Sequence, residues 1–158
     1  LLLTAPLRER DLVLGKFLAA AFMVWAGLGA SLASWMLLER ALPAQVPDVW
    51  SLLPPLLLLL LQSLTWTAAG TLLSLAARRP WTAASGTLVV IFGSAWIWGA
   101  AARFLPEMRW HIPSFPLALE LMDASAGRFA LPSLVLHASL TWWFLYASVR
   151  LLEARRWR

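Results

Sequence analysis

Cysteine is absent from this chain, and charged residues are scarce. With no Cys among 158 residues, a disulfide framework, a zinc–thiolate site and a redox dithiol are all excluded. Charged residues account for 13% of the chain, against roughly 25% in soluble proteins. The net charge is +5, but Lys16 is the only lysine among 13 basic residues, and most of the arginines flank apolar runs. This placement of charge is typical of a membrane protein and not of a nucleic-acid-binding protein.

Apolar residues are what the sequence has in excess. They make up 61% of the chain, and the mean hydropathy is +0.72. A 17.5 kDa globule cannot bury that much apolar surface, and intrinsic disorder requires low hydrophobicity instead. Four windows are long enough to cross ~30 Å of hydrocarbon, at about 17–38, 52–77, 81–102 and 131–152. We therefore predict one all-α domain over 1–158, a polytopic transmembrane helix bundle with four spans.

Prolines mark the ends of the predicted spans. Pro54, Pro55 and Pro132 fall in first turns, where a missing N–H costs little, and no proline falls in the middle of a window. Only about three residues, 78–80, separate the second window from the third. These two spans are therefore predicted to form an antiparallel hairpin.

The basic residues predict the orientation. Nine lie on one side of the predicted membrane, namely Arg8, Arg10, Lys16, Arg78, Arg79, Arg150, Arg155, Arg156 and Arg158. Four lie on the other side, namely Arg40, Arg103, Arg109 and Arg128. The positive-inside rule places both termini, the turn at 78–79 and a basic tail at 153–158 in the cytoplasm.

The longest connection, 103–130, is predicted to lie on the outer side. It is too short and too polar to cross the membrane, so we expect one or two short helices at the outer surface. Apolar residues within 117–122 would face lipid or the bundle, while Glu120 and Asp123 would reach water or a basic group such as Arg109. Two interpretations of these acids stay open, a solvated helix face and a gate over the outer mouth.

Motifs for enzymatic chemistry are missing. The only lysine follows Gly15 but precedes Phe17, so no phosphate-binding P-loop is present. His111 and His137 are too far apart in sequence to form a His-Glu-x-x-His metal site. Ser85 with His137 as a base would leave ~15 Å between them in depth, whereas a nucleophile and its base need ~3 Å. We predict no enzyme activity, no cofactor and no metal.

Polar residues inside the spans are the candidates for function. His137 lies about 9 Å below the expected outer boundary, and Gln62 and Thr65 belong to the most polar span. Packing and hydrogen bonding between helices is one interpretation of these three residues. Lining a translocation path is the other. Small residues four apart, such as Gly70 with Ser74, favour close helix packing.

The segment before the first span has two interpretations. An apolar stub, a turn at Pro6 and a charged helical start lead into the membrane, and Lys16 marks the inner boundary. Asp11 near the helix start would complement the helix dipole. The segment is either a lipid-facing anchor or a docking surface for a cytoplasmic partner. The chain opens at Leu1 without an initiator Met, and we expect its true N-terminus to lie upstream.

Both ends of the sequence resemble a known family. "LLLTAP" at 1–6 with "DLVLGKFL" at 11–18 resembles the "LLT-(A/S)-P … (E/D)-(I/L)-V-L-G-K-F" stretch of type-2 ATP-binding-cassette (ABC) exporter permeases. "VRLLEARRWR" at 149–158 is similar to the "VRxLExRRWR" terminus of the gliding-motility and copper-site-maturation (NosY-like) branch. "PSFP" at 113–116 through Glu120 resembles that branch's "SPFxHFE" segment, but the family position before Glu120 holds no His, because residues 117–119 are Leu, Ala and Leu.

The resemblance implies a membrane-spanning permease subunit that works with a separate ABC ATPase subunit and a second permease copy in the lipid bilayer. Members of the family carry six spans, so this chain would be an N-terminally truncated fragment. The cytoplasmic segment 1–16 would couple to the ATPase through residues in its family-like stretch, namely Thr4, Pro6, Arg8, Arg10, Asp11 and Lys16. Competing classes are a non-transporting membrane anchor or assembly subunit and a membrane-embedded enzyme.

Overall fold

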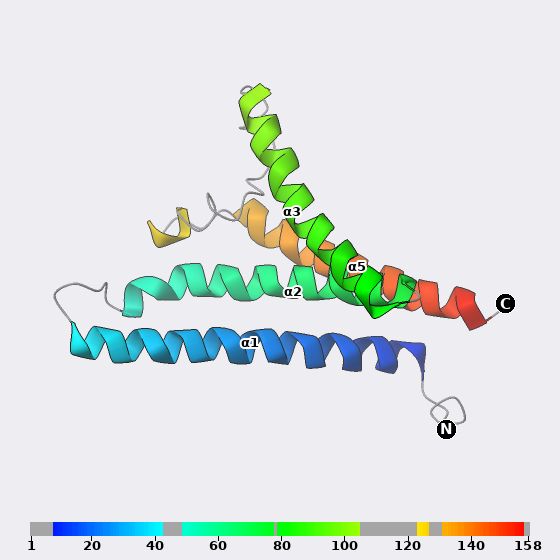
Figure 1. Ribbon diagram of the computed structural model, residues 1–158, viewed down its shortest axis with the longest axis horizontal. Helices are drawn as coiled ribbons and strands as arrows, with labels where there is room; N and C mark the ends of the chain where they lie inside the picture. The colour runs from blue at the N-terminus through cyan, green and yellow to red at the C-terminus, as the bar shows by residue number, and fades with distance from the viewer. Residues whose placement is uncertain (1–7, 43–48, 78, 105–122, 127–130, 157–158) are drawn as a thin grey trace.

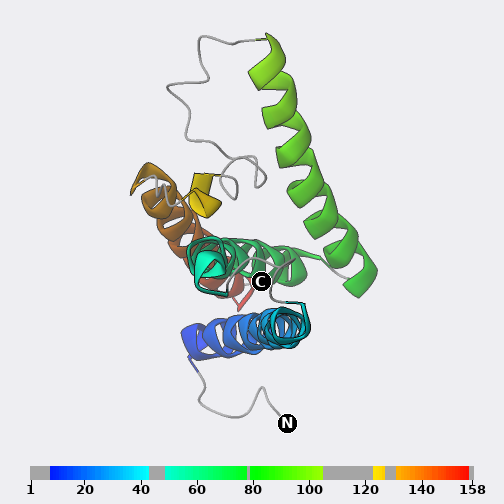
Figure 2. The ribbon, with the colours of Figure 1, turned by 90° about the vertical axis from the view of Figure 1, so that its left-hand side faces the viewer.

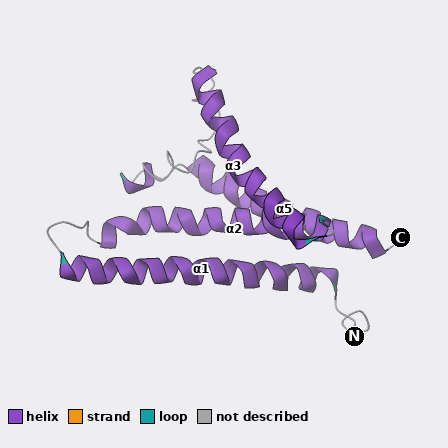
Figure 3. Ribbon diagram, in the orientation of Figure 1, coloured by secondary structure: helices purple, strands orange, loops and turns teal. Residues whose placement is uncertain are grey.

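The computed structural model describes residues 8–42, 49–77, 79–104, 123–126 and 131–156. Its elements are α1 (Glu9–Ala41), the 3-10 turn η2 (Val49–Leu52), α2 (Leu53–Ala76), α3 (Pro80–Phe104) and α5 (Leu131–Arg156). Within these ranges no strand occurs (Figure 3). The all-α prediction is confirmed, and the last three predicted windows match helices to within a few residues at most ends.

α1 differs most from its predicted window, because it begins at Glu9 and not near 17. Hydrophobicity marks where a helix enters the membrane, and a charged first turn can continue the same helix outside it. Glu9 and Asp11 lie in that first turn, where their carboxylates complement the positive end of the helix dipole. The charged start and the first span are therefore one continuous helix of 33 residues.

α2 is the centre of the arrangement. It packs against α1, α3 and α5, and it contributes the longest set of buried residues, namely Leu58, Gln62, Thr65, Ala68, Ala69 and Thr71. α1 lies alongside α2 in the opposite direction, whereas α5 runs in the same direction as α2 (Figure 1). The start of α1, the turn between α2 and α3, and the C-terminal end of α5 therefore gather at one end of the bundle.

α2 and α3 form the predicted hairpin. A Cβ at Gly70 would lie 3.6 Å from Cγ2 of Thr87, and one at Gly86 would lie 3.8 Å from Leu73. These small residues let the two helices approach closely near the turn. Beyond this contact α3 diverges from the other helices (Figure 2), and side chains such as Trp96 are largely exposed.

Three of the described helices are long and apolar enough to cross a membrane. They are α1, the continuous stretch Trp50–Ala76, and the Pro80–Ile97 part of α3. α5 is also helical over the fourth predicted window, but it is not among these three. The reason is its content of polar residues, several of which are buried against the rest of the bundle.

Little of the outer connection 103–130 falls within the described residues. One helical turn occurs at 123–125, with Asp123 exposed and Ala124 buried. Glu120 and the apolar residues expected to face lipid lie outside the described residues. The amphipathic helix expected there stays a prediction.

Candidate functional site

Buried polar side chains occur on both α2 and α5, two helices that pack against each other. They are Gln62, Thr65 and Thr71 on α2, and Ser133, His137 and Ser148 on α5. We call these six residues, together with half-buried Thr141, the polar seam. Small side chains at Ala68 and Ala69 complete the α2 side. The seam therefore joins two helices through polar and small residues where an apolar core would be the ordinary solution.

Thr65 and His137 form the centre of the seam. Neither is exposed by more than 1%, and Oγ1 of Thr65 lies 3.2 Å from Nδ1 of His137. The same oxygen lies 3.2 Å from the carbonyl oxygen of His137 and 3.1 Å from Oγ1 of Thr141. Thr141 in turn donates to the His137 carbonyl at 2.7 Å. One hydroxyl on α2 thus meets a ring nitrogen, a carbonyl and a second hydroxyl on α5.

A threonine hydroxyl has one proton to donate and can accept as well. If Nδ1 of His137 carries no proton, the Thr65 hydroxyl donates to it. If Nδ1 carries the proton, it donates a hydrogen bond to the Thr65 oxygen. The Thr65 hydroxyl then rotates so that its own proton points toward the His137 carbonyl or Thr141. The seam accommodates both neutral tautomers of the ring by rotation of one hydroxyl.

Gln62 lies one helical turn from Thr65 on the same face of α2. It is only 3% exposed, and Oε1 has no hydrogen-bond partner among the described residues. Leaving a buried polar atom unsatisfied costs about 1–3 kcal/mol, so this oxygen is a local weakness of the seam.

Hydrogen bonds outside the seam also hold the helices together. Nη2 of Arg155 donates to the carbonyl of Ala76 at 2.9 Å, which caps the C-terminal end of α2 with a positive charge. Nε1 of Trp25 on α1 donates to Oγ of Ser63 on α2 at 3.0 Å. α2 is therefore tied to α1 and to α5 by side-chain hydrogen bonds.

His137 meets α2 near the middle of that helix. The sequence places this residue about 9 Å below the outer boundary, counted from the start of its own helix. In the structure it meets Thr65, which lies about 18 Å along α2 from Leu53 and so near the midpoint of that helix. α5 begins further along the bundle axis than α2, which brings His137 to the middle.

Three of the predicted path residues, Gln62, Thr65 and His137, are brought to one interface. The structure does not bring the other predicted site residues to that interface. Arg8, Arg10, Asp11 and Lys16 are exposed around the start of α1, and Asp123 is exposed in its single turn. Thr4, Pro6 and Glu120 lie outside the described residues.

Sequence reasoning predicted His137 but missed the other α5 members of the seam, Ser133, Thr141 and Ser148. A signal was present, because Ser133, His137 and Thr141 recur every four residues and so share one face of a helix. The face that they form points at Thr65.

Ser85 does not join His137. Its Oγ donates to the carbonyl of Thr82 at 3.3 Å, and the residue is exposed on α3. His137 is occupied with Thr65 on α2. Within the described ranges, no group of three or more His, Cys, Asp or Glu side chains could hold a metal ion. The seam therefore has the geometry of a helix–helix contact and not that of a nucleophile with its base.

Comparison with known proteins gives one family. Residues 1–119 match the family model described as ABC-2 family transporter protein. No curated protein and no solved structure matches the chain. The matched region includes α1, α2 and α3, and it ends before α5.

Proposed function

Because this chain belongs to the ABC-2 transporter family, we propose that it is a permease subunit of the type-2 exporter class, in the gliding-motility and copper-site-maturation branch. It moves a substrate across the inner membrane with ATP hydrolysed on a separate subunit. The observation that carries this proposal is the family match over α1 to α3, the same helices that are long and apolar enough to span a membrane. The family is a membrane component of transporters and not an enzyme family.

A partner ATPase is a necessary part of the proposal, because the sequence contains no P-loop of its own. A second permease copy is the other part. Large apolar side chains remain exposed on α1 and α3, including Phe22, Met23, Phe92 and Trp96. Lipid covers some of this surface in the membrane, and a dimer interface covers the rest.

We place the coupling to the ATPase at segment 1–16, in the cytoplasm with the C-terminus. Arg8, Arg10 and Asp11 are exposed at the start of α1, where they are accessible to a cytoplasmic protein. Lys16 follows within two turns and is exposed as well. The same end of the bundle carries the turn between α2 and α3 and the end of α5 (Figure 1). A docking protein would therefore meet three elements together.

Charge reversal tests the coupling. With Arg8→Glu and Arg10→Glu together, we expect the protein to remain inserted and the ATPase to be lost in a pull-down, with transport lost in parallel. Arg40→Glu is the matched control, because that residue is an exposed arginine on the same helix but in its last turn, at the other end of the bundle. Pull-down of the ATPase at wild-type yield by the double variant, with unchanged transport, would reject the coupling assignment.

We assign the seam to helix packing. Gln62, Thr65 and His137 are closed in between α2 and α5, and their contacts use the polar groups that a path would have to offer to a substrate. A path along these residues requires the two helices to separate. Glu120 and Asp123 remain candidates for an outer gate. Unchanged transport by Glu120→Gln with Asp123→Asn would exclude that role.

A non-transporting anchor is the alternative function. It predicts that the complex hydrolyses ATP without nucleotide-dependent movement of any solute or lipid. The two functions are separated by comparing the contents of sealed vesicles with and without ATP. The complex is measured beside a complex that carries an inactive ATPase.

A further inference from the structure

The face of α5 that points away from the seam carries its own pattern. Ser139, Trp143, Tyr146 and Arg150 are spaced by four, three and four residues, so they form one stripe along the helix. Ser139 lies in the N-terminal half of α5, Trp143 lies at its middle, and Arg150 is close to its C-terminal end. Toward the C-terminal end of α5, the side chains of the stripe therefore change from a small hydroxyl to two aromatic rings and then to a cation.

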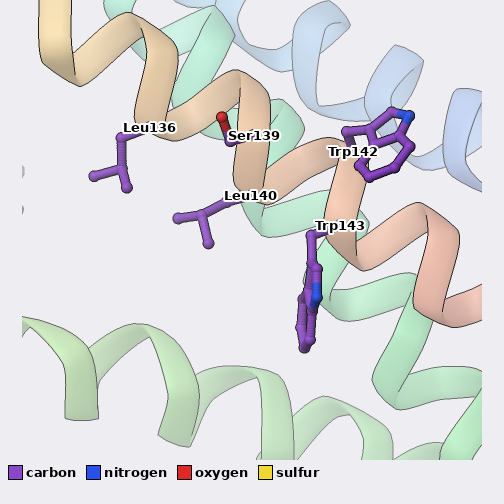
Figure 4. A pocket seen from close by; sticks show the side chains of 5 residues that line it. All are labelled: Leu136, Ser139, Leu140, Trp142 and Trp143. Atoms are coloured by element: carbon purple, nitrogen blue, oxygen red, sulfur yellow. The ribbon is translucent and has the colours of Figure 1, made fainter.

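The middle part of this stripe borders a groove. The groove has a volume of about 660 Å³ and is lined by Leu136, Ser139, Leu140, Trp142 and Trp143 (Figure 4). Its walls are almost wholly apolar, because the single hydroxyl, on Ser139, already donates to the carbonyl of Val135 at 2.7 Å. Such a lining fits a hydrocarbon chain, and its remaining polar groups are the indole N–H groups of Trp142 and Trp143.

Below the groove, aromatic and charged side chains form a ladder. The Trp142 and Tyr146 rings stack with centroids 5.5 Å apart. Nε of Arg150 donates to the Tyr146 hydroxyl at 2.9 Å, and Nη1 donates to Glu153 at 2.9 Å. These bonds use two of the five N–H groups of the guanidinium and hold its plane in place. A fixed guanidinium fork is the side chain best suited to bind a phosphate.

The spacing between groove and cation matches a lipid. Ser139 and Arg150 are 11 residues apart, which is about 16 Å along a helix. Half of the ~30 Å hydrocarbon core is about 15 Å. With Arg150 at the level of the head groups, the groove lies where the acyl chain of the same leaflet lies.

We propose that this face of α5 binds one anionic phospholipid from the leaflet at the C-terminal end of the helix. The phosphate lies on Arg150, and an acyl chain follows Trp143 into the groove. The seam fixes α5 along α2, one of the membrane-crossing helices, so the opposite face is presented to the lipid around the bundle. An anionic head group is favoured because exposed Lys16, Arg79 and Arg155 lie at the same end of the bundle (Figure 1).

The test uses photo-crosslinking in nanodiscs. The protein, purified from membranes, is exposed to phosphatidylglycerol with a photoreactive group on its acyl chain, and labelled peptides are mapped by mass spectrometry. We expect labelling within 136–143, reduced at least fivefold by Arg150→Gln and unchanged by Arg40→Gln, a matched exposed arginine in the last turn of α1, at the other end of the bundle. The corresponding phosphatidylcholine probe should label this region at least fivefold less.

A second variant covers the acyl-chain part and guards against misfolding of the first. Trp143→Ala removes a wall of the groove from a side chain that is 55% exposed, and we expect labelling of 136–143 to fall at least threefold. Equal labelling by both probes, or no loss with Arg150→Gln and Trp143→Ala, would overturn the proposal. Competition by inorganic phosphate alone would show an anion site in place of a lipid site. Disulfide dimers of Ser139→Cys would show that a second copy covers this face. Either of these last two results also rejects the proposal.

Discussion

The Thr65–His137 contact allows a quantitative prediction for the polar seam. Thr65→Val replaces the hydroxyl by a methyl group of nearly the same size, so the change removes hydrogen bonding with little change in volume. The hydroxyl is the only α2 group shown within bonding distance of Nδ1 of His137, at 3.2 Å. Interhelical hydrogen bonds in membranes contribute ~0.6 kcal/mol on average and up to ~1.7 kcal/mol. A buried nitrogen that loses its partner adds a penalty of about 1–3 kcal/mol, moderated here by the long bond.

We therefore expect Thr65→Val to lower the free energy of unfolding by about 1–2 kcal/mol. That corresponds to a roughly 5- to 30-fold change in the ratio of folded to unfolded protein. His137→Leu should be destabilising as well. The double variant should cost less than the sum of the two single variants, with a coupling energy of ~0.6–1.7 kcal/mol, because each single change already removes the contact between Thr65 and His137.

The assay is equilibrium unfolding in mixed micelles, followed by circular dichroism as SDS replaces a mild detergent. Thr67→Val is the matched control. It is the same substitution on the same helix, but the Thr67 hydroxyl donates only to backbone carbonyls of α2, those of Ser63 and Leu64. We expect its effect to stay within about 0.5 kcal/mol. Strict additivity of Thr65→Val and His137→Leu would refute the reasoning, because it would mean that the two side chains do not interact.

Three further predictions concern the arrangement of the helices. A cysteine at Ala126 should react with an impermeant thiol reagent from outside the cell and a cysteine at Ala77 should not, and the reverse pattern would invert the topology. Gly70→Leu should separate α2 from α3, because a Cβ at this position is already only 3.6 Å from Cγ2 of Thr87 on α3. Gly29→Leu is the control, because a Cβ there meets nothing within 4 Å. Equal loss of thermal stability in the two variants would contradict this packing. Arg155→Gln removes the 2.9 Å hydrogen bond to the carbonyl of Ala76, the last residue of α2, and should lower the free energy of unfolding by a few tenths to about 1 kcal/mol in the same assay. The loss should be smaller at high salt. A loss of stability that does not depend on salt would argue that the charge of Arg155 does not act on the dipole of α2.

The polar seam shows which features the sequence pattern predicts and which features only helix packing decides. The sequence marks Gln62, Thr65 and His137 as polar groups in apolar helices, because a membrane makes such residues costly and therefore informative. It does not reveal which of them meet, because sequence spacing relates residues only within one helix. His137 and Thr65 are 72 positions apart, and only the parallel packing of α5 on α2 brings them within 3.2 Å.

The outer apolar surfaces show the same division. Small residues at four-residue spacing occur on both α1 and α2, and the pattern alone treats them alike. In the structure Gly70 lies against α3, while Gly27 and Gly29 meet nothing within 4 Å. The difference arises because a short turn holds α2 and α3 together, whereas the two glycines of α1 have no such neighbour among the described residues.

What the sequence alone determined is the class of protein and the helices. An excess of apolar residues in runs of about 20, punctuated by proline and arginine, has one physical solution in lipid, because each backbone polar group must be satisfied within its own helix. The tertiary structure alone decided the rest: which helix lies at the centre, which polar side chains share the seam, and which face of α5 remains open. Those outcomes depend on shape complementarity and on the direction in which helices pack, and neither quantity is encoded in the periodicity of a single segment.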